Sequence, residues 1–237
     1  MKRNDGYTLV EIVVSIAVGL VIIGAIYAAV NMGQRSTSNV ERKVAAHQDA
    51  RAALQLMALE IQMASYNPRS TSNIWQNPAT CTAASGNQNY RGIQAATASS
   101  ISIEMDANEN GVVGSGNPNP NEIIKYVYNS DSQRITREVG CGAGAQAFLG
   151  DVPGNPRTVR VINDDSASNP TDIPVFRYFN AQGTEITTGQ LPAAIPNIAR
   201  IDITLHVETE DIDPNSGQRR QMIYSTTVIP RNHVINR

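Results

Sequence analysis

The residue that most restricts the function of this chain is Glu11, a carboxylate inside a long apolar stretch. The segment from Tyr7 to Met32 reads YTLVEIVVSIAVGLVIIGAIYAAVNM and carries no other charged residue. A helix needs about 20 such residues to cross a bilayer. A carboxylate at mid-membrane costs about 2.5–3.5 kcal/mol on insertion scales, so its presence in a spanning helix indicates a function.

A short charged segment, MKRNDG, precedes the apolar stretch and places Lys2 and Arg3 on the side expected to stay cytoplasmic. An ordinary secretory signal is cleaved after a shorter apolar core. Here the plausible cleavage point, Gly6, precedes the apolar run, so cleavage would leave the hydrophobic helix on the mature protein. The new amino group at Tyr7 could then pair with Glu11 of a neighbouring subunit. The alternative is a plain signal-anchor helix whose glutamate lies near the headgroups.

The sequence GYTLVE resembles the type IV prepilin processing signal, with Gly before the cut, an aromatic residue after it and Glu fifth in the mature chain. The resemblance implies that the prepilin peptidase cuts after Gly6 and methylates Tyr7, and that Glu11 aids assembly of the helix into the filament core. Phe is the commonest first mature residue of that family, and many major pilins have a proline late in this helix. This chain has Tyr7 and no proline before Pro68, which argues against the bulk filament subunit.

Because no helix breaker precedes Pro68, we expect one nearly continuous helix from Tyr7 to about Ser65, roughly 90 Å long. Its second half has apolar residues at steps of three and four, so this half should pack on a sheet. The expected organisation is a leader peptide, a transmembrane and filament-core helix, an amphipathic continuation and a globular domain, at 1–6, 7–33, 34–66 and 67–237.

The remainder of the chain predicts an α+β fold, in which the long helix packs on an antiparallel β-sheet. Residues 67–99 are rich in Asn, Ser, Thr, Ala and Pro and predict a long, mainly irregular connection. We expect its Trp75 and Tyr90 to pack against the sheet, with an exposed recognition surface as the alternative. The segment from Gln48 to Tyr66 resembles the helix end of PilW-like minor pilins and of the related J-type pseudopilins of type II secretion. The order of the elements and the closing Arg231-Asn232 also resemble the PilW-like family. The candidate strands are 101–105, 122–128, 134–139, 157–162, 175–179, 200–208 and 221–229.

The two cysteines, Cys81 and Cys141, lie in the part of the chain that an N-terminal anchor would export. In an oxidising compartment this predicts a structural disulfide, with two free thiols as the alternative. Closing a loop of about 60 residues would stabilise the fold by roughly 4 kcal/mol in the chain-entropy model.

The sequence DANENG, which starts at Asp106, fits the first half of a calcium loop, D-x-[DN]-x-[DN]-G. Asp106, Asn108 and Asn110 would supply side-chain oxygens and Val112 its backbone carbonyl. An EF-hand would place a bidentate Glu where this chain has Asn117, and Glu122 could serve only at a different spacing. The alternative is an Asn/Gly-rich turn whose side chains bond their own backbone. Asp211, Asp213 and Asn215 form a second acidic turn, where a metal is less favoured.

Catalysis and nucleic-acid binding find little support in the sequence. His47, His206 and His233 have no companions at a recognisable catalytic spacing, and no nucleophile motif such as G-x-S-x-G is present. A formal net charge of -2 argues against nucleic acid held by a large positive field. We therefore expect no enzyme and no nucleic-acid partner.

The function that these features favour is that of a minor pilin, incorporated into a type IV pilus or initiating its assembly. Its expected partners are other pilin or pseudopilin subunits, the prepilin peptidase and the inner membrane. The chain would cross that membrane once before it enters a pilus or a periplasmic or extracellular filament. The alternatives are a minor pseudopilin of a type II secretion system and a membrane-anchored adhesin or DNA-uptake module. In the last case loops 67–99 and 106–121 would contact the ligand.

Overall fold

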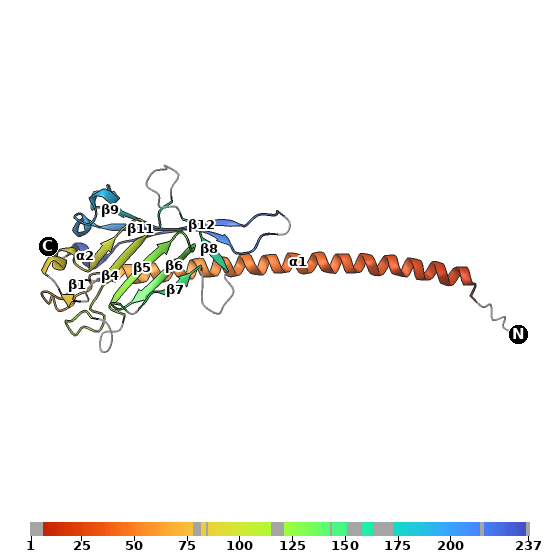
Figure 1. Cartoon of the computed structure of the whole chain (residues 1–237), viewed down its shortest axis with the longest axis horizontal. Helices are drawn as coiled ribbons and strands as arrows, with labels where there is room; N and C mark the ends of the chain where they lie inside the picture. The colour runs from red at the N-terminus through yellow and green to blue at the C-terminus, as the bar shows by residue number, and fades with distance from the viewer. Residues whose placement is uncertain are drawn as a thin grey trace.

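The computed structural model describes residues 7–77, 82–83, 85–114, 121–142, 144–150, 158–163, 173–213 and 216–235. One long helix, α1, passes along a β-rich domain with its C-terminal half, and its N-terminal half projects from that domain (Figure 1).

Helix α1 spans Leu9–Gln62, which is 54 residues. It starts at Thr8, whose side chain and that of Glu11 cap the free backbone groups of the first turn. Its last residues are followed by Ser65 with a φ of 67°, a left-handed conformation that ends the helix. The predicted continuous helix is confirmed, and it ends three residues earlier than expected.

Two five-stranded antiparallel sheets, one two-stranded sheet formed by β1 and β2, and several short helices follow the helix. The first sheet has the order β3-β4-β5-β6-β7, and in the second sheet the order is β10-β9-β11-β12, with β8 also pairing to β11. The strand bounds are β1 (Gln76–Asn77), β2 (Thr82–Ala83), β3 (Ile93–Ala96), β4 (Ser100–Glu104), β5 (Ile123–Asn129), β6 (Arg134–Val139), β7 (Gln146–Leu149), β8 (Val159–Val161), β9 (Phe176–Phe179), β10 (Glu185–Ile186), β11 (Arg200–Thr209) and β12 (Gln221–Val228). The short helices are η1 (Ser85–Tyr90), η2 (Thr188–Gln190), η3 (Ile195–Asn197) and α2 (Arg231–Ile235).

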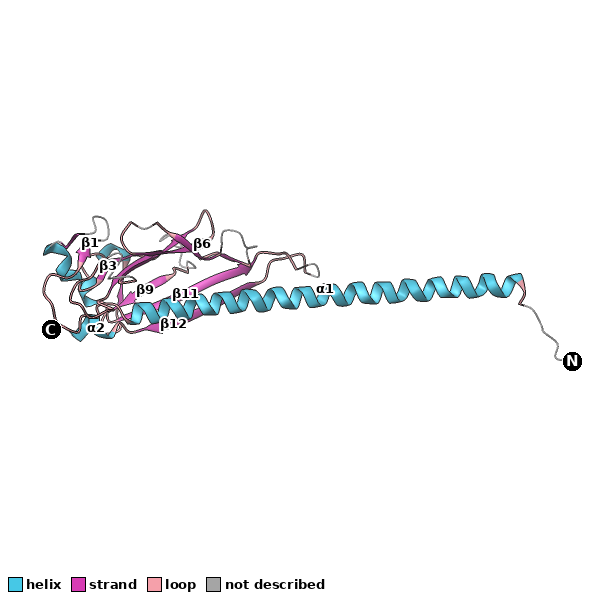
Figure 2. Cartoon of the chain, turned by 90° about the horizontal axis from the view of Figure 1, so that it is seen from below, coloured by secondary structure: helices cyan, strands magenta, loops and turns pink. Residues whose placement is uncertain are grey.

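The main core lies between the second half of α1 and the inner faces of both sheets (Figure 2). Alanines at positions 46, 50 and 53 let the strands approach the helix closely, and Met57 and Ile61 are fully buried one turn further on. Replacing either of these two large side chains by alanine would cost about 2–5 kcal/mol. On the side of the first sheet, Glu60 pairs with Arg137 of β6 and accepts a hydrogen bond from Tyr126 of β5.

The predicted α+β class is confirmed, but the connection 67–99 is more ordered than expected. It contains β3, which pairs with β4, and the short helix η1. The motif IQAA of β3 has too few residues and too little alternation to reveal a strand. Trp75 is only 5% exposed and packs with Ile74, Val113 and Ile123, so the expected packing role is confirmed.

Candidate functional site

The N-terminus of α1 holds Tyr7, Thr8 and Glu11 within one turn. The Glu11 Oε2 atom accepts hydrogen bonds from the Thr8 backbone N–H at 2.9 Å and from the Thr8 hydroxyl at 3.0 Å. In return, the Glu11 backbone N–H donates to the Thr8 hydroxyl oxygen at 3.3 Å. Gly6, the other predicted processing residue, lies outside the described residues.

This capping box was missed in the sequence, although its T-x-x-E pattern stands directly before the apolar run. Both local hydrogen bonds end on one carboxylate oxygen of Glu11, and Oε1 makes none with the described residues. Glu11 therefore starts the helix and still has an acceptor oxygen for a group from outside the chain. A cation held there in a medium of low dielectric would be bound far more strongly than in water.

The helix that follows Glu11 leaves its apolar side chains uncovered. Within the described residues α1 is the single helix long and apolar enough to cross a membrane, and its most apolar window is 0% buried. Tyr7 is 87% exposed at the tip. An apolar surface of this extent is normally covered by lipid or by other apolar helices.

Residues 1–27 match the family model described as the prokaryotic N-terminal methylation motif. This match and the long helix packed on antiparallel strands fit a type IV pilin-like protein. The motif implies a member of the pilin and pseudopilin class. No curated protein and no solved structure matches the chain, so the PilW-like subtype rests on the sequence resemblance alone.

In the predicted calcium loop, the candidate ligands bond the backbone of their own loop. The two oxygens of Asp106 accept hydrogen bonds from the backbone N–H groups of Asn110 and Gly111, at 3.0 and 2.9 Å. The Asn108 side-chain oxygen accepts from the Asn110 N–H at 3.0 Å, and the Asn110 side chain accepts from the Val112 N–H at 2.8 Å. These bonds are those expected of the alternative Asn/Gly-rich turn.

The fold also brings Glu122 to this loop, although 16 residues separate it from Asp106. Both residues are fully buried. The Glu122 carboxylate accepts hydrogen bonds from the backbone N–H groups of Asn108 and Gly114, each at 3.3 Å. Burial raises the pKa of Glu122, and the charge of Asp106 adds to the increase, while the hydrogen bonds oppose it. Among the described residues no group of three or more His, Cys, Asp or Glu side chains is placed to hold a metal ion, so calcium stays a prediction.

The remaining candidate residues are distributed over the domain. Cys141 is not a free thiol in the structure. Its expected partner Cys81 lies outside the described residues, so the Cys81–Cys141 bridge stays a prediction. His47 hydrogen-bonds with Tyr224 of β12, and His233 is buried near the end of the chain, 2.9 Å from the Ser65 hydroxyl.

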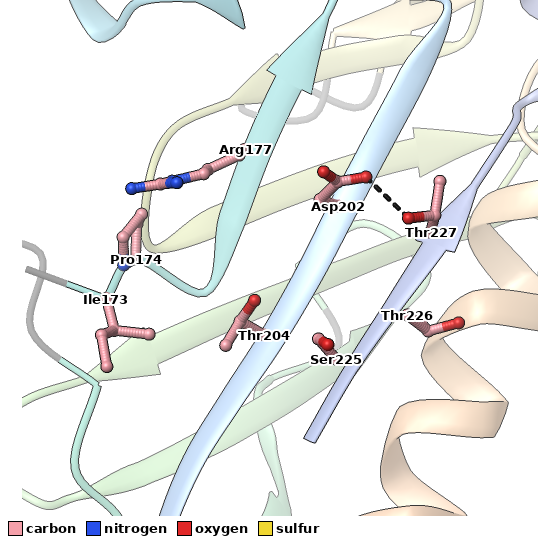
Figure 3. A pocket seen from close by; sticks show the side chains of 8 residues that line it. All are labelled: Ile173, Pro174, Arg177, Asp202, Thr204, Ser225, Thr226 and Thr227. Carbon is pink, nitrogen blue, oxygen red and sulfur yellow. Dashed lines mark hydrogen bonds between the residues drawn. The ribbon is translucent and has the colours of Figure 1, made fainter. Parts of the chain in front are cut away.

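A groove of about 540 Å³ crosses the outer face of the second sheet, over β9, β11 and β12 (Figure 3). Its floor is polar, and an Asp202–Thr227 hydrogen bond of 2.9 Å links β11 to β12 across it. The groove leads to β12, the outermost strand of the sheet. Its lining is Ile173, Pro174, Arg177, Asp202, Thr204, Ser225, Thr226 and Thr227.

Proposed function

We propose that this chain is a structural minor pilin, cut between Gly6 and Tyr7 and then incorporated into a type IV pilus or used to initiate it. The observation that carries the proposal is the placement of Glu11 in the first turn of an uncovered apolar helix, with one carboxylate oxygen left for a partner. Cleavage would put a cationic amino group on Tyr7. The corresponding group of a neighbouring subunit is a suitable partner for Glu11.

The proposal is tested by removing the charge of Glu11 in the full chain, in cells that assemble the filament. Glu11→Ala and Glu11→Gln should both keep membrane retention, because they remove a costly carboxylate from the spanning segment. Cleavage should also proceed, because the resemblance to the processing signal depends mainly on Gly6. Both should lower the amount of this subunit in sheared filaments, or the number of pili if the subunit acts as an initiator. The glutamine variant separates charge from shape.

Glu41→Ala is the matched control, because it removes an exposed carboxylate from the same helix outside its apolar part. It should incorporate like the wild type. Wild-type incorporation of both Glu11 variants would show that Glu11 is merely a tolerated residue near the headgroups.

Processing gives a second test of the same proposal. The mature protein should begin at Tyr7 and carry an N-terminal methyl group, which intact mass and N-terminal sequencing of native protein measure. A mature N-terminus beyond Val30 would identify an ordinary cleaved signal and end the pilin interpretation.

A minor pseudopilin of a type II secretion system is the second candidate, since the methylation motif is shared by pilins and pseudopilins. Co-purification from the native membrane separates the two. Pilus subunits in the purified complex support the first candidate, and secretion-system subunits support the second.

A further inference from the structure

Strand β12 has one edge that is not paired with any described strand. Strand β12 pairs along all its eight residues with β11 in one continuous antiparallel register. It is the last strand of the second sheet, and no described strand pairs with its other side (Figure 3). Its sequence, QMIYSTTV, contains no charge and no proline, which are the devices that usually prevent an edge strand from pairing with another chain.

The hydrogen bonds of β11 show which backbone groups of β12 face outward. The Thr204 N–H donates to the carbonyl of Val175, on the β9 side, whereas the Thr209 N–H donates to Arg220, on the β12 side. Since bonding direction alternates along an antiparallel strand, odd-numbered residues of β11 bond to even-numbered residues of β12. The backbone groups of the odd-numbered residues of β12 therefore point away from the sheet; in the middle of the strand these are Ile223, Ser225 and Thr227.

Beside this edge the helix leaves an apolar strip uncovered. His47 of α1 hydrogen-bonds with Tyr224, which fixes the side of the helix that lies under β12. Val40 and Val44 precede His47 by seven and three residues, so they lie on the same side of the helix. They are 56% and 47% exposed, and Ile223 on the outer face is 58% exposed. A strand added to β12 would cover apolar surface below as well as complete the backbone hydrogen bonds.

A two-fold pairing of β12 with a second copy does not fit a membrane-anchored chain. Such a pairing is antiparallel, because each strand must make the same bonds to its copy. Strand β12 runs in the same direction as α1 (Figure 1). Asp213, which precedes β12 in the chain, contacts Lys43, and Tyr224 within β12 contacts His47 further along the helix. The two N-terminal helices would then point in opposite directions. The other described strands with an unpaired edge are all shorter than β12. In the two larger sheets they are β3, β7, β8 and β10, with four, four, three and two residues, and β1 and β2 have two residues each, so none can pair along all eight residues of β12.

The proposed Glu11 contact determines how far a neighbouring subunit is shifted along the helix axis relative to this one. If the amino group of a neighbour's first mature residue pairs with Glu11, the two parallel helices are offset by the distance from Tyr7 to Glu11. Four residues of helix correspond to about 6 Å. A pilin-like neighbour with a helix of similar length thus has its globular domain beside this one, at the height of β12.

We propose that the free edge of β12, with Val40 and Val44 of α1 beneath it, binds an extended strand of a different pilin-like subunit by β-strand addition. This rests on the proposed function, because it needs neighbours anchored in the same membrane. The strand that fits is uncharged and rich in β-branched residues, with an apolar side chain next to Ile223 and small polar ones next to Ser225 and Thr227.

The experiment is photo-crosslinking of the full chain in cells that assemble the filament, with benzoylphenylalanine at position 225. Position 182 in the exposed turn between β9 and β10 is the control site. We expect a covalent adduct of this chain with another pilin-like subunit from position 225 and none from position 182. Adding Ile223→Lys, which places a charge on the edge, should reduce the adduct roughly fivefold, whereas Ala181→Lys, in the exposed turn between β9 and β10, should not.

Ser225→Pro, without the crosslinker, gives a second measurement. It removes one outward N–H at an edge position, where a sheet tolerates proline. Incorporation into sheared filaments should fall roughly fivefold, as expected for the loss of one such bond. An adduct with a second copy of this chain, or none in filaments that contain the wild-type subunit, would overturn the β12 proposal and leave the pilin function standing. Absence of the wild-type chain from every filament fraction would instead refute the proposed function.

Discussion

Glu104 of β4 is the most strongly perturbed carboxyl group of the described domain, and its pH dependence can be worked out. It is fully buried between the first sheet and the segment that precedes β3. Its Oε2 atom accepts hydrogen bonds from the Gln76 backbone N–H at 2.8 Å and the Gln94 amide at 3.3 Å, while Oε1 has no hydrogen-bond partner among the described residues. Burial raises the pKa of Glu104 from 4.5 to about 8, although these two hydrogen bonds lower it.

A raised pKa of an acid makes folding less favourable as the pH increases. Between pH 4.5 and 8 the unfolded chain has lost the proton of Glu104 while the folded chain keeps it, so the free energy of unfolding falls. At about 1.36 kcal/mol per pH unit, the contribution of Glu104 decreases by about 3 kcal/mol up to pH 7 and by about 4 kcal/mol up to pH 8. Well above pH 8, where Glu104 is ionised in both states, this contribution is constant.

Glu104→Gln removes the titrating group and keeps the shape of the side chain. We expect the glutamine variant to lack most of the stability decrease between pH 5 and 8, and to be more stable than the wild type at pH 8. The measurement is urea unfolding of the domain from Gln34 onward at a series of pH values. Glu41→Gln is the control at an exposed carboxylate and should keep the wild-type dependence. Parallel pH profiles of the wild type and Glu104→Gln would refute the reasoning.

Three further predictions concern the same domain. Gly92→Ala should destabilise it by more than the ~1 kcal/mol that a left-handed alanine costs, because the new Cβ would lie 2.8 Å from the Ser65 Cα. Gly183 has a similar positive φ but lies in open space, so Gly183→Ala should cost only the ~1 kcal/mol of the backbone conformation. Thiol labelling of unreduced, denatured exported protein should find neither Cys81 nor Cys141, and two labelled thiols would exclude the bridge. Calcium at 100 times its Kd should add about 2.7 kcal/mol to the free energy of unfolding, and Asp106→Ala should abolish this. Equal unfolding midpoints in calcium and in chelator would support the alternative, an Asn/Gly-rich turn without a metal.

The features that could be predicted from the sequence are those with a long, regular pattern. The apolar run around Glu11 and the absence of proline before Pro68 predict α1. The alternation in 200–208 and the turn NSDS after Tyr128 predict β11 and the β5–β6 hairpin, all of which the structure contains. In each case residues close in the chain determine the element.

The features that could not be predicted depend on residues far apart in the chain. The division of the strands into two sheets follows from how β8 and β9 both pair with β11, which no local pattern indicates. Likewise, the alternation of β4 suggests that Glu104 faces solvent, whereas the segment around Trp75 covers that face. The short helix α2 and the burial of His233 also depend on contacts with Ser65 and Ile195.

The continuity of α1 connects the proposed contact at Glu11 with the proposed contact at β12. From Leu9 to Gln62 the helix has no proline and no break, so the distance along it from Glu11 to His47 is fixed at about 54 Å. The β11–β12 connection is joined to the same helix by ion pairs, Arg42–Asp211 at 3.2 Å and Lys43–Asp213 at 3.3 Å. Exposed pairs contribute only about 0–1 kcal/mol each, so the alternating buried face of β11 must supply most of the attachment. A neighbour positioned at the N-terminus is therefore also positioned at the edge of β12, and a kink introduced between the two sites should weaken the second contact while leaving the first intact.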